Sequence, residues 1–227
     1  MIRFFDILFS GLALVVLSPL FLPIVLILGL TGEGKIFYKQ DRVGRNGKTF
    51  RLLKFATMLE NSPNLPGGDI TSGDDPRVLL VGKFLRKTKI NELPQLINIL
   101  KGELSVVGPR PLTPQNFRYY EISVQKIIFQ KQPGLTGIGS IVFRDEETII
   151  NRSKKKTLDC YREEIAPYKG ELEKWFMPKH NIRFYFLLIF LTAWVVFSPK
   201  SKIIWKVFPS IPIPPKSLQQ NLGYSAF

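Results

Sequence analysis

Residues 7–30 read ILFSGLALVVLSPLFLPIVLILGL, and none of these 24 positions carries a charge. As one helix the segment would be about 36 Å long, enough to cross the roughly 30 Å hydrocarbon core of a bilayer. Ser18 and Pro19 lie at its midpoint and Pro23 follows. Proline removes a backbone donor and disfavours helical geometry in the residue before it. The segment is therefore expected to break at Ser18 and Pro19 into two apolar arms.

Each arm would be about 16 Å long, roughly half the hydrocarbon thickness, so a bent helix could enter and leave the membrane on one face. Arg3 precedes the apolar run and Lys35 follows it, so neither end lacks the positive charge expected on the cytoplasmic side. The sequence favours a re-entrant hairpin over residues 1–34. A kinked helix that spans the membrane is the alternative, because spanning helices tolerate proline. A cleaved secretory signal is disfavoured by the length of the run and the lack of a small-x-small site after it.

The composition limits the rest of the chain to one globular unit. The chain has 227 residues, 45% of them hydrophobic, which suffices for one core beside the apolar segment. This unit is placed at residues 35–200, and residues 201–227 are expected to form an extended or disordered Pro-rich tail. The chain has one cysteine, Cys160, and one histidine, His180. It therefore has too few such residues for a typical zinc site or for a nucleophile activated by histidine. Transfer chemistry would have to use carboxylates, lysines, arginines or a hard cation.

Periodicity and turn residues predict an α+β fold, with a small β-element and several amphipathic or interfacial helices. Strands are expected at 35–39 and 49–54, loops at 60–76 and 108–111, and a turn at 133–139. Helices are expected at 78–88, 92–100, 116–130, 161–175 and 184–197. The 161–175 helix appears polar, whereas 184–197 is too short to span comfortably and fits an interfacial or buried helix.

A net charge of +14 favours an anionic partner, which could be a lipid surface, a nucleotide or nucleic acid. Several cations stand in loop-proximal segments around Glu92, which is expected at a helix N-terminus: Lys54, Arg77, Arg86, Lys87 and Arg110. Cations that converge on one carboxylate suit diphosphate chemistry. The alternative is a solvated basic face, which is what charge runs usually form.

Eight sequence blocks distinguish these interpretations. They are KQDRVGR (39–45), KFATM (54–58), DPR (75–77), LRKT (85–88), ELPQL (92–96), LKGELS (100–105), VGPRP (107–111) and PGLTG (133–137). In this order they resemble the signature of the bacterial sugar transferases, the monotopic polyprenyl-phosphate phosphoglycosyl transferases that initiate exopolysaccharide, capsule and glycan assembly. The resemblance covers roughly residues 1–140 and is weaker in the last third of the chain.

The resemblance implies an enzyme that transfers a phosphosugar from a UDP-sugar to undecaprenyl phosphate, with Mg²⁺, and releases UMP. It also implies a re-entrant helix broken at Ser-Pro, contact with inner-membrane phospholipids, and a catalytic domain on the cytoplasmic face of the bacterial inner membrane. A homo-oligomer stays open. In this family a carboxylate of an Asp-Glu pair is proposed to attack the diphosphate, which divides one difficult displacement into two.

Candidate site residues follow from these blocks. Catalytic roles are expected for Glu92, Asn91, Lys54 and Arg86, with Glu92 also as the metal ligand. Substrate phosphate is expected to meet Arg110, Pro109 and Arg77. Prolines on both sides stiffen the Arg110 loop, and a guanidinium binds phosphate oxygens in pairs.

The chain departs from the family pattern at two positions. Asn91 stands where most members have aspartate, and an amide is a poor nucleophile and a weaker metal ligand. Three outcomes are open: Glu92 attacks, another carboxylate such as Asp75 substitutes, or the protein is silent. Glu92 is favoured, since a helix N-terminus and nearby cations would keep it ionised. Ala56 replaces a common arginine, which leaves phosphate contact to Lys54, Arg86 and Arg110.

Two other classes of function compete with the enzyme. A non-catalytic scaffold that binds UDP-sugar or polyprenyl phosphate is supported by Asn91. Nucleic-acid binding rests on the charge alone, because no interleaved aromatic and basic motif or known binding fold accompanies it. No nucleic-acid partner is therefore expected.

Overall fold

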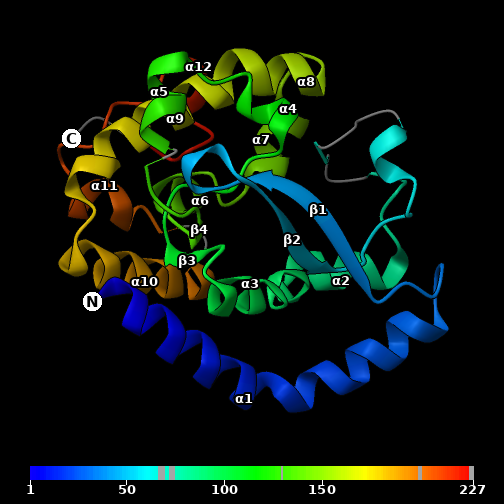
Figure 1. Ribbon diagram of the computed structural model, residues 1–227. Coiled ribbons are helices and arrows are strands. Elements are labelled where there is room, and N and C mark those ends of the chain that lie inside the picture. Colours follow the sequence, from blue (N-terminus) through cyan, green and yellow to red (C-terminus); the bar gives the residue numbers. More distant parts are fainter. Residues whose placement is uncertain (66–69, 72–74, 129, 199–200, 225–227) are drawn as a thin grey trace.

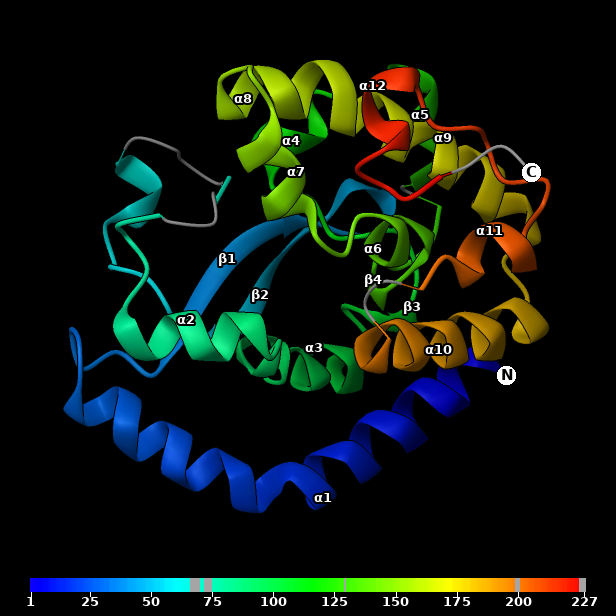
Figure 2. The same cartoon turned by 180° about the vertical axis from the view of Figure 1, so that it is seen from behind.

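The computed structural model describes residues 1–65, 70–71, 75–128, 130–198 and 201–224. It is a mixed α/β structure, mostly helical, with a long apolar N-terminal helix and small sheets (Figure 1). Helices α2, α3 and α10 form a layer between α1 and the rest of the molecule in both views (Figures 1 and 2). The predicted combination of helices with a small β-element is confirmed.

The helices and helical turns have the following bounds. They are α1 (Ile2–Leu30), η1 (Arg45–Gly47), η2 (Ser62–Asn64), α2 (Leu80–Lys87), η3 (Ile90–Glu92), α3 (Gln95–Lys101), α4 (Pro114–Phe117), α5 (Ile122–Ile128), α6 (Ile138–Val142), α7 (Glu146–Arg152), α8 (Thr157–Cys160), η4 (Tyr161–Ile165), α9 (Ala166–Phe176), η5 (Met177–Lys179), α10 (Ile182–Phe197), α11 (Ile203–Val207) and α12 (Lys216–Gln219).

Helix α1 stays helical through Pro19 and Pro23 and bends near its middle, so that both its ends turn toward the domain (Figure 1). In a regular helix the residue at position 19 would donate to the carbonyl of Val15, which proline cannot do. The hydroxyl of Ser18 donates to that carbonyl instead, at 2.8 Å. The expected interruption is therefore a bend within one continuous helix, because the Ser18 hydroxyl satisfies the carbonyl that Pro19 leaves free.

The first turns of α1 are fixed to the domain by polar contacts. The buried carboxylate of Asp6 accepts hydrogen bonds from Ser105 Oγ at 2.9 Å, from Val106 N at 2.8 Å and from Tyr185 Oη at 2.9 Å. The guanidinium of Arg3 donates to the carbonyls of residues 99 and 100, where α3 ends. The last carbonyl groups of a helix have no hydrogen-bond partner within the helix, so they attract such a cation. The start of α1 is thus part of the globular unit.

The outer side of α1 and the layer above it expose apolar residues. Of the described helices, α1 is the one that is long and apolar enough to cross a membrane. Exposed large apolar side chains include Leu12, Val15 and Leu22 on α1, Leu80 and Phe84 on α2, and Phe190, Trp194 and Phe197 on α10. The opposite face of α10 buries Tyr185, Leu188 and Leu191. Helix α10 therefore belongs to the core on one face and exposes apolar side chains on the other.

Strands β1 (Phe37–Val43) and β2 (Thr49–Phe55) form an antiparallel hairpin close to the expected positions. A second sheet pairs β3 (Ser105–Val107) with β4 (Gly134–Thr136) in parallel. Strand β4 lies where only a turn was expected. A Cβ at Gly134 would stand 2.0 Å from the backbone nitrogen of Gly108, so glycine permits this close approach.

Helix α9, which follows the π-helical turn η4, is central to the core, and the prediction of a polar helix there is wrong. The buried face that runs through η4 and α9 includes Tyr161, Ile165, Tyr168, Leu172 and Phe176. These residues recur every three or four positions and so share one helical face. The charged residues that dominate the composition lie mostly on the outer face, apart from Lys169 and Glu173, which are buried.

Two other expectations differ from the structure. The single helix expected at 116–130 is instead α4 and α5, with Thr113 Oγ1 accepting from Asn116 N at the start of α4. Residue 129 lies outside the described residues, as do 66–69 and 72–74 of the expected 60–76 loop. The tail is not extended or disordered over 201–224, because α11 and α12 bury Trp205, Phe208 and Leu218 against the core.

Candidate active site

Four separate elements bring the candidate residues together. Lys54 lies near the end of β2, Arg86 on α2, Glu92 at the end of η3, and Arg110 in the loop after β3. Helix α2 packs so closely on the chain before it that a Cβ at Gly82 would lie 2.2 Å from the carbonyl oxygen of Thr57. This contact fixes the side of α2 that carries Arg86.

Glu92 and Arg110 form the ion pair at the centre of the site. Arg110 Nη2 lies 3.4 Å from Glu92 Oε1, and the Glu92 side chain is only 16% exposed. Burial alone would raise the pKa of the Glu92 carboxyl, but Arg110, Lys54 and Lys89 outweigh it and lower that pKa to about 2. Glu92 in turn raises the pKa of Arg110. The Glu92 carboxylate is therefore ionised at any physiological pH.

Lys54 is half-buried beside this pair. Burial lowers the pKa of its ammonium, and Arg42, Arg110 and Arg86 lower it further, whereas Glu92 opposes them. The resulting pKa is about 7. The three arginines disfavour a further positive charge on Lys54, so the site has a surplus of cations. An anionic ligand would reduce the repulsion among them.

Arg86 reaches a partner that the sequence did not predict. Arg86 Nη2 lies 2.6 Å from Glu147 Oε1, and Arg86 Nη1 lies 3.7 Å from Met58 Sδ. The partner comes from α7, 61 positions along the chain. The acidic run at 145–147, which follows the PGLTG turn, is the signal in the sequence that could have indicated this partner. Glu146 from the same run pairs with Lys169.

Asn91 lies directly before Glu92 and is 6% exposed. Its Oδ1 is buried and has no hydrogen-bond partner among the described residues. A buried acceptor without a partner is costly, so its presence needs an explanation, such as a bound ion or water. An aspartate here would add a second carboxylate to the cation-rich site.

Arg77 is not brought into this group. Its guanidinium is buried and donates through Nε to Asp75 Oδ1 at 2.8 Å, with further bonds to the carbonyls of Ser62 and Ile70. Arg77 lowers the pKa of the Asp75 carboxyl mainly through the side-chain hydrogen bond that it donates to that carboxyl. Through Arg77 this pair is tied to Ser62 and Ile70, so Asp75 is poorly placed to replace the missing aspartate.

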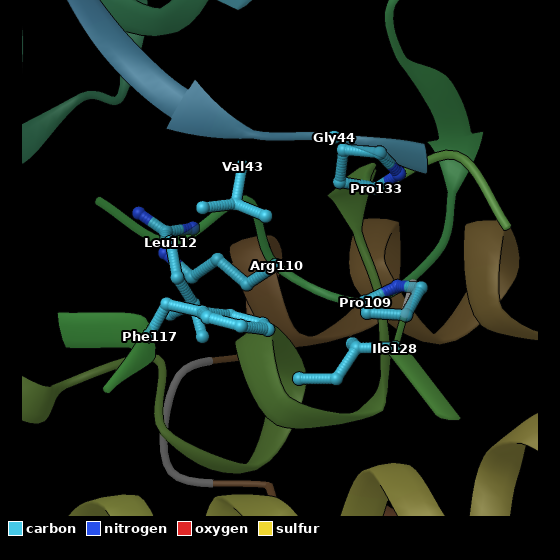
Figure 3. Close-up of a pocket in the computed structure, with 8 residues that line it drawn as sticks. All are labelled: Val43, Gly44, Pro109, Arg110, Leu112, Phe117, Ile128 and Pro133. Carbon is cyan, nitrogen blue, oxygen red and sulfur yellow. The ribbon is translucent and has the colours of Figure 1, made fainter. Parts of the chain in front are cut away.

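The 108–111 loop is rigid for reasons visible in the backbone. Gly108 N donates to the carbonyl of Thr136 at 2.9 Å, and Gly134 N donates to the carbonyl of Pro109 at 2.7 Å. Figure 3 shows Pro109 and Arg110 beside a small pocket that Val43, Leu112 and Phe117 also line. Pro109 thus fixes the loop backbone, and Arg110 carries its cation.

Among the described residues, no three Asp, Glu, His or Cys side chains form a ready metal cluster. Glu92 and the Asn91 amide oxygen are the adjacent oxygen donors. Mg²⁺ commonly binds through one or two protein oxygens together with substrate phosphates and water. These two donors are compatible with that arrangement, but they are too few to bind the ion through protein ligands alone.

Comparisons with known proteins identify the family of the chain. Residues 1–199 match the model of a family described as "Bacterial sugar transferase". The exopolysaccharide production protein ExoY of Sinorhizobium fredii is 40% identical over 164 residues, which cover 66% of this chain and 72% of that protein. The undecaprenyl-phosphate galactose phosphotransferase of Salmonella typhimurium is 37% identical over 158 residues, 63% of this chain and 33% of that protein. The UDP-glucose:undecaprenyl-phosphate glucose-1-phosphate transferase of Klebsiella pneumoniae is 35% identical over 159 residues, 68% of this chain and 34% of that protein.

Proposed function

Because the chain belongs to the bacterial sugar transferase family, we propose that it transfers a sugar 1-phosphate from a UDP-sugar to undecaprenyl phosphate. The reaction releases UMP and is the first membrane step of exopolysaccharide synthesis. The similarity to transferases named for this reaction supports the assignment. The observation that carries it is the ionised Glu92 carboxylate, surrounded by Arg110, Lys54 and Lys89 in a site with surplus positive charge.

Glu92 is the proposed nucleophile. One oxygen of its carboxylate attacks the phosphorus that carries the sugar, the bond to the bridging oxygen breaks, and UMP leaves with that oxygen. The phosphosugar is then held as an acyl phosphate on Glu92. A phosphate oxygen of undecaprenyl phosphate attacks the same phosphorus, which yields the lipid diphosphate sugar and frees the carboxylate. Glu92 is not consumed.

The cations stabilise the charge that moves during both steps. Arg110 lies within 3.4 Å of Glu92 and can exchange this long contact for phosphate oxygens as the diphosphate enters. Lys54 adds a positive charge on the β2 side and Arg86 one on the α2 side. Positive groups fixed at the positions where charge develops usually make the largest contribution to such a transfer.

Mg²⁺ is proposed as the cofactor. Glu92, with the Asn91 amide oxygen beside it, is the expected protein ligand, and the orphaned Asn91 Oδ1 supports this placement. When bound, the ion would neutralise charge on the diphosphate. Because one of the two expected donors is a neutral amide, the ion would depend more strongly on the substrate's phosphates for its binding.

We infer that α1 is re-entrant and that the catalytic domain lies on the cytoplasmic face of the inner membrane. The bend in α1, and the Asp6 and Arg3 contacts that hold its first turns to the domain, support this placement. The exposed apolar side chains of α2 and α10 lie on the layer nearest α1. This arrangement would place Glu92 near the headgroups, where a polyprenyl phosphate presents its charge.

Labelling in oriented vesicles tests this topology. An N-terminal epitope and a thiol introduced by Lys35→Cys are expected to react on the same, cytoplasmic side. Val15→Cys, which is exposed on the protein in the middle of α1, is the control and should resist a water-soluble maleimide because lipid covers it. Cys160 is buried and should stay silent. Reaction of the two ends on opposite faces would show a spanning helix and refute the re-entrant arrangement.

The function itself is tested by UMP release. Purified protein with undecaprenyl phosphate, Mg²⁺ and a panel of UDP-sugars should release UMP with at least one donor. The panel is needed because the recognised blocks concern phosphate and metal, not the sugar hydroxyls. Binding of UDP-sugar without UMP release, across the panel, would favour the scaffold that Asn91 suggests.

The pH profile should report the charge of Lys54. If Lys54 must be charged to meet the diphosphate, kcat/KM should fall as the pH rises through about 7, because the lowered pKa removes the charge there. Lys54→Arg keeps a cation at every pH, so this variant should lose the decline even if its activity is lower throughout. Measurements from about pH 6 to about pH 9 suffice. An unchanged decline in Lys54→Arg would assign it to another group.

A further inference from the structure

Behind the Arg110 loop, α9 carries a buried carboxyl that the proposed reaction does not use. Glu173 is 4% exposed and lines a small cavity together with Pro109, Arg110 and Gly139. The backbone N–H of Arg110 faces the Glu173 carboxyl at this cavity and favours its ionised form. Glu173 Oε2 is buried without a hydrogen-bond partner among the described residues.

The surroundings of Glu173 are crowded and leave it little freedom. A Cβ at Gly139 would lie 3.1 Å from Glu173 Oε1, so the absence of a side chain on α6 makes room for the carboxyl. The neighbouring cation on α9, Lys169, is hydrogen-bonded to Glu146 of α7. Lys169 also lies over the rings of Phe143 and Tyr161, at 5.1 and 5.5 Å. Glu173 is therefore not required as the partner of Lys169, and it shares its cavity with Arg110.

We propose that Glu173 is a positioning residue for the transfer reaction: its carboxyl holds the backbone of Arg110 so that the Arg110 guanidinium stays opposite Glu92. The inference rests on the proposed function. Two contacts on opposite sides of one residue carry it. The main chain of Arg110 faces Glu173 at the small cavity that both residues line, and its side chain is paired with Glu92 at 3.4 Å.

The charge state of Glu173 suits this role. Burial raises the pKa of its carboxyl to about 8, although Lys169 and the Arg110 N–H both favour the ionised form. The other titratable groups around it are Glu146, Tyr120 and Tyr161. Tyr120 interacts with Tyr161, Glu146 and Glu173, whereas Lys169 interacts with Glu146 and lies over the Tyr161 ring. At neutral pH Glu173 is mostly protonated. It can thus accept the Arg110 N–H bond without placing a second negative charge beside Arg110 to compete with Glu92.

Three substitutions test the proposal. Glu173→Gln keeps a neutral acceptor of the same size and should retain most of the wild-type kcat/KM at neutral pH. Glu173→Ala removes the acceptor and should lower kcat/KM by about tenfold or more, as loss of a supporting contact typically does. Glu171→Ala, on the exposed side of the same helix and paired with Lys174 at the surface, is the control and should stay near wild type.

A double-mutant cycle separates positioning from general damage. In an Arg110→Ala background, Glu173→Ala should have little further effect, because the group that it positions is gone. The affinity for UDP, measured by calorimetry, should weaken in Glu173→Ala and persist in Glu173→Gln. Equal losses in the wild-type and Arg110→Ala backgrounds, or a Glu173→Ala variant that behaves like Glu171→Ala, would overturn the proposal. A wild-type chain that neither releases UMP nor binds UDP would overturn the proposed function, and this inference with it.

Discussion

Replacing Glu92 with glutamine is expected to reduce UMP release by about 10³-fold or more, because the amide retains the shape of the side chain and loses its nucleophile. The same change should abolish any transfer of radiolabelled phosphosugar onto the protein, which wild type should show when undecaprenyl phosphate is withheld. Activity and labelling are measured on the same preparation. Glu60→Gln, an exposed position outside the site, is the control for substitution of a glutamate.

An electrostatic explanation must be separated from the nucleophilic one. Glu92 is the group that raises the pKa of Lys54 against the surrounding arginines, so the glutamine variant should also carry a less charged Lys54 at neutral pH. Lowering the pH restores that charge. If UMP release by Glu92→Gln recovered in acid, Glu92 would act through Lys54 and would not be the nucleophile. We expect no recovery.

The second large effect is a gain. Asn91→Asp should raise turnover by about 10²-fold, the inverse of the loss that replacing a functional aspartate by asparagine typically causes. The new carboxylate would be buried, which is costly without compensation. The surplus of cations that lowers the pKa of Lys54 supplies it. The same carboxylate should raise the pKa of Lys54 and move the alkaline decline of kcat/KM to higher pH.

The double variant Asn91→Asp/Glu92→Gln identifies which carboxylate attacks. Activity well above that of Glu92→Gln alone would show that the aspartate can take over the attack, as the family pattern implies. Asn91→Gln serves as the control for a change at a buried position. If Asn91→Asp left the turnover unchanged or lowered it, the asparagine would suit this chain. If the wild type also released no UMP, the scaffold interpretation would gain weight.

Local features of the sequence were enough to predict the long apolar helix and most of the candidate site. An uncharged run of 24 residues and a proline at its midpoint act through hydropathy and backbone chemistry, which need no partner elsewhere in the chain. The bend in α1 therefore follows from Ser18 and Pro19. Lys54, Glu92 and Arg110 were likewise identifiable, because each stands in a short block with a recognisable pattern.

The partners of these groups were decided by the tertiary structure alone. Arg77 and Arg110 carry the same guanidinium group. Arg77 is buried in a pair with Asp75 and has a structural role, whereas Arg110 faces Glu92. Glu147 reaches Arg86 from 61 residues away, and Glu173 reaches the Arg110 backbone from a helix that looked polar in sequence. Pairing energies and pKa shifts depend on distance in space and on exclusion of water. The sequence by itself determined the long apolar helix and the chemical groups of the candidate site, and the folded packing decided which carboxylate each cation meets.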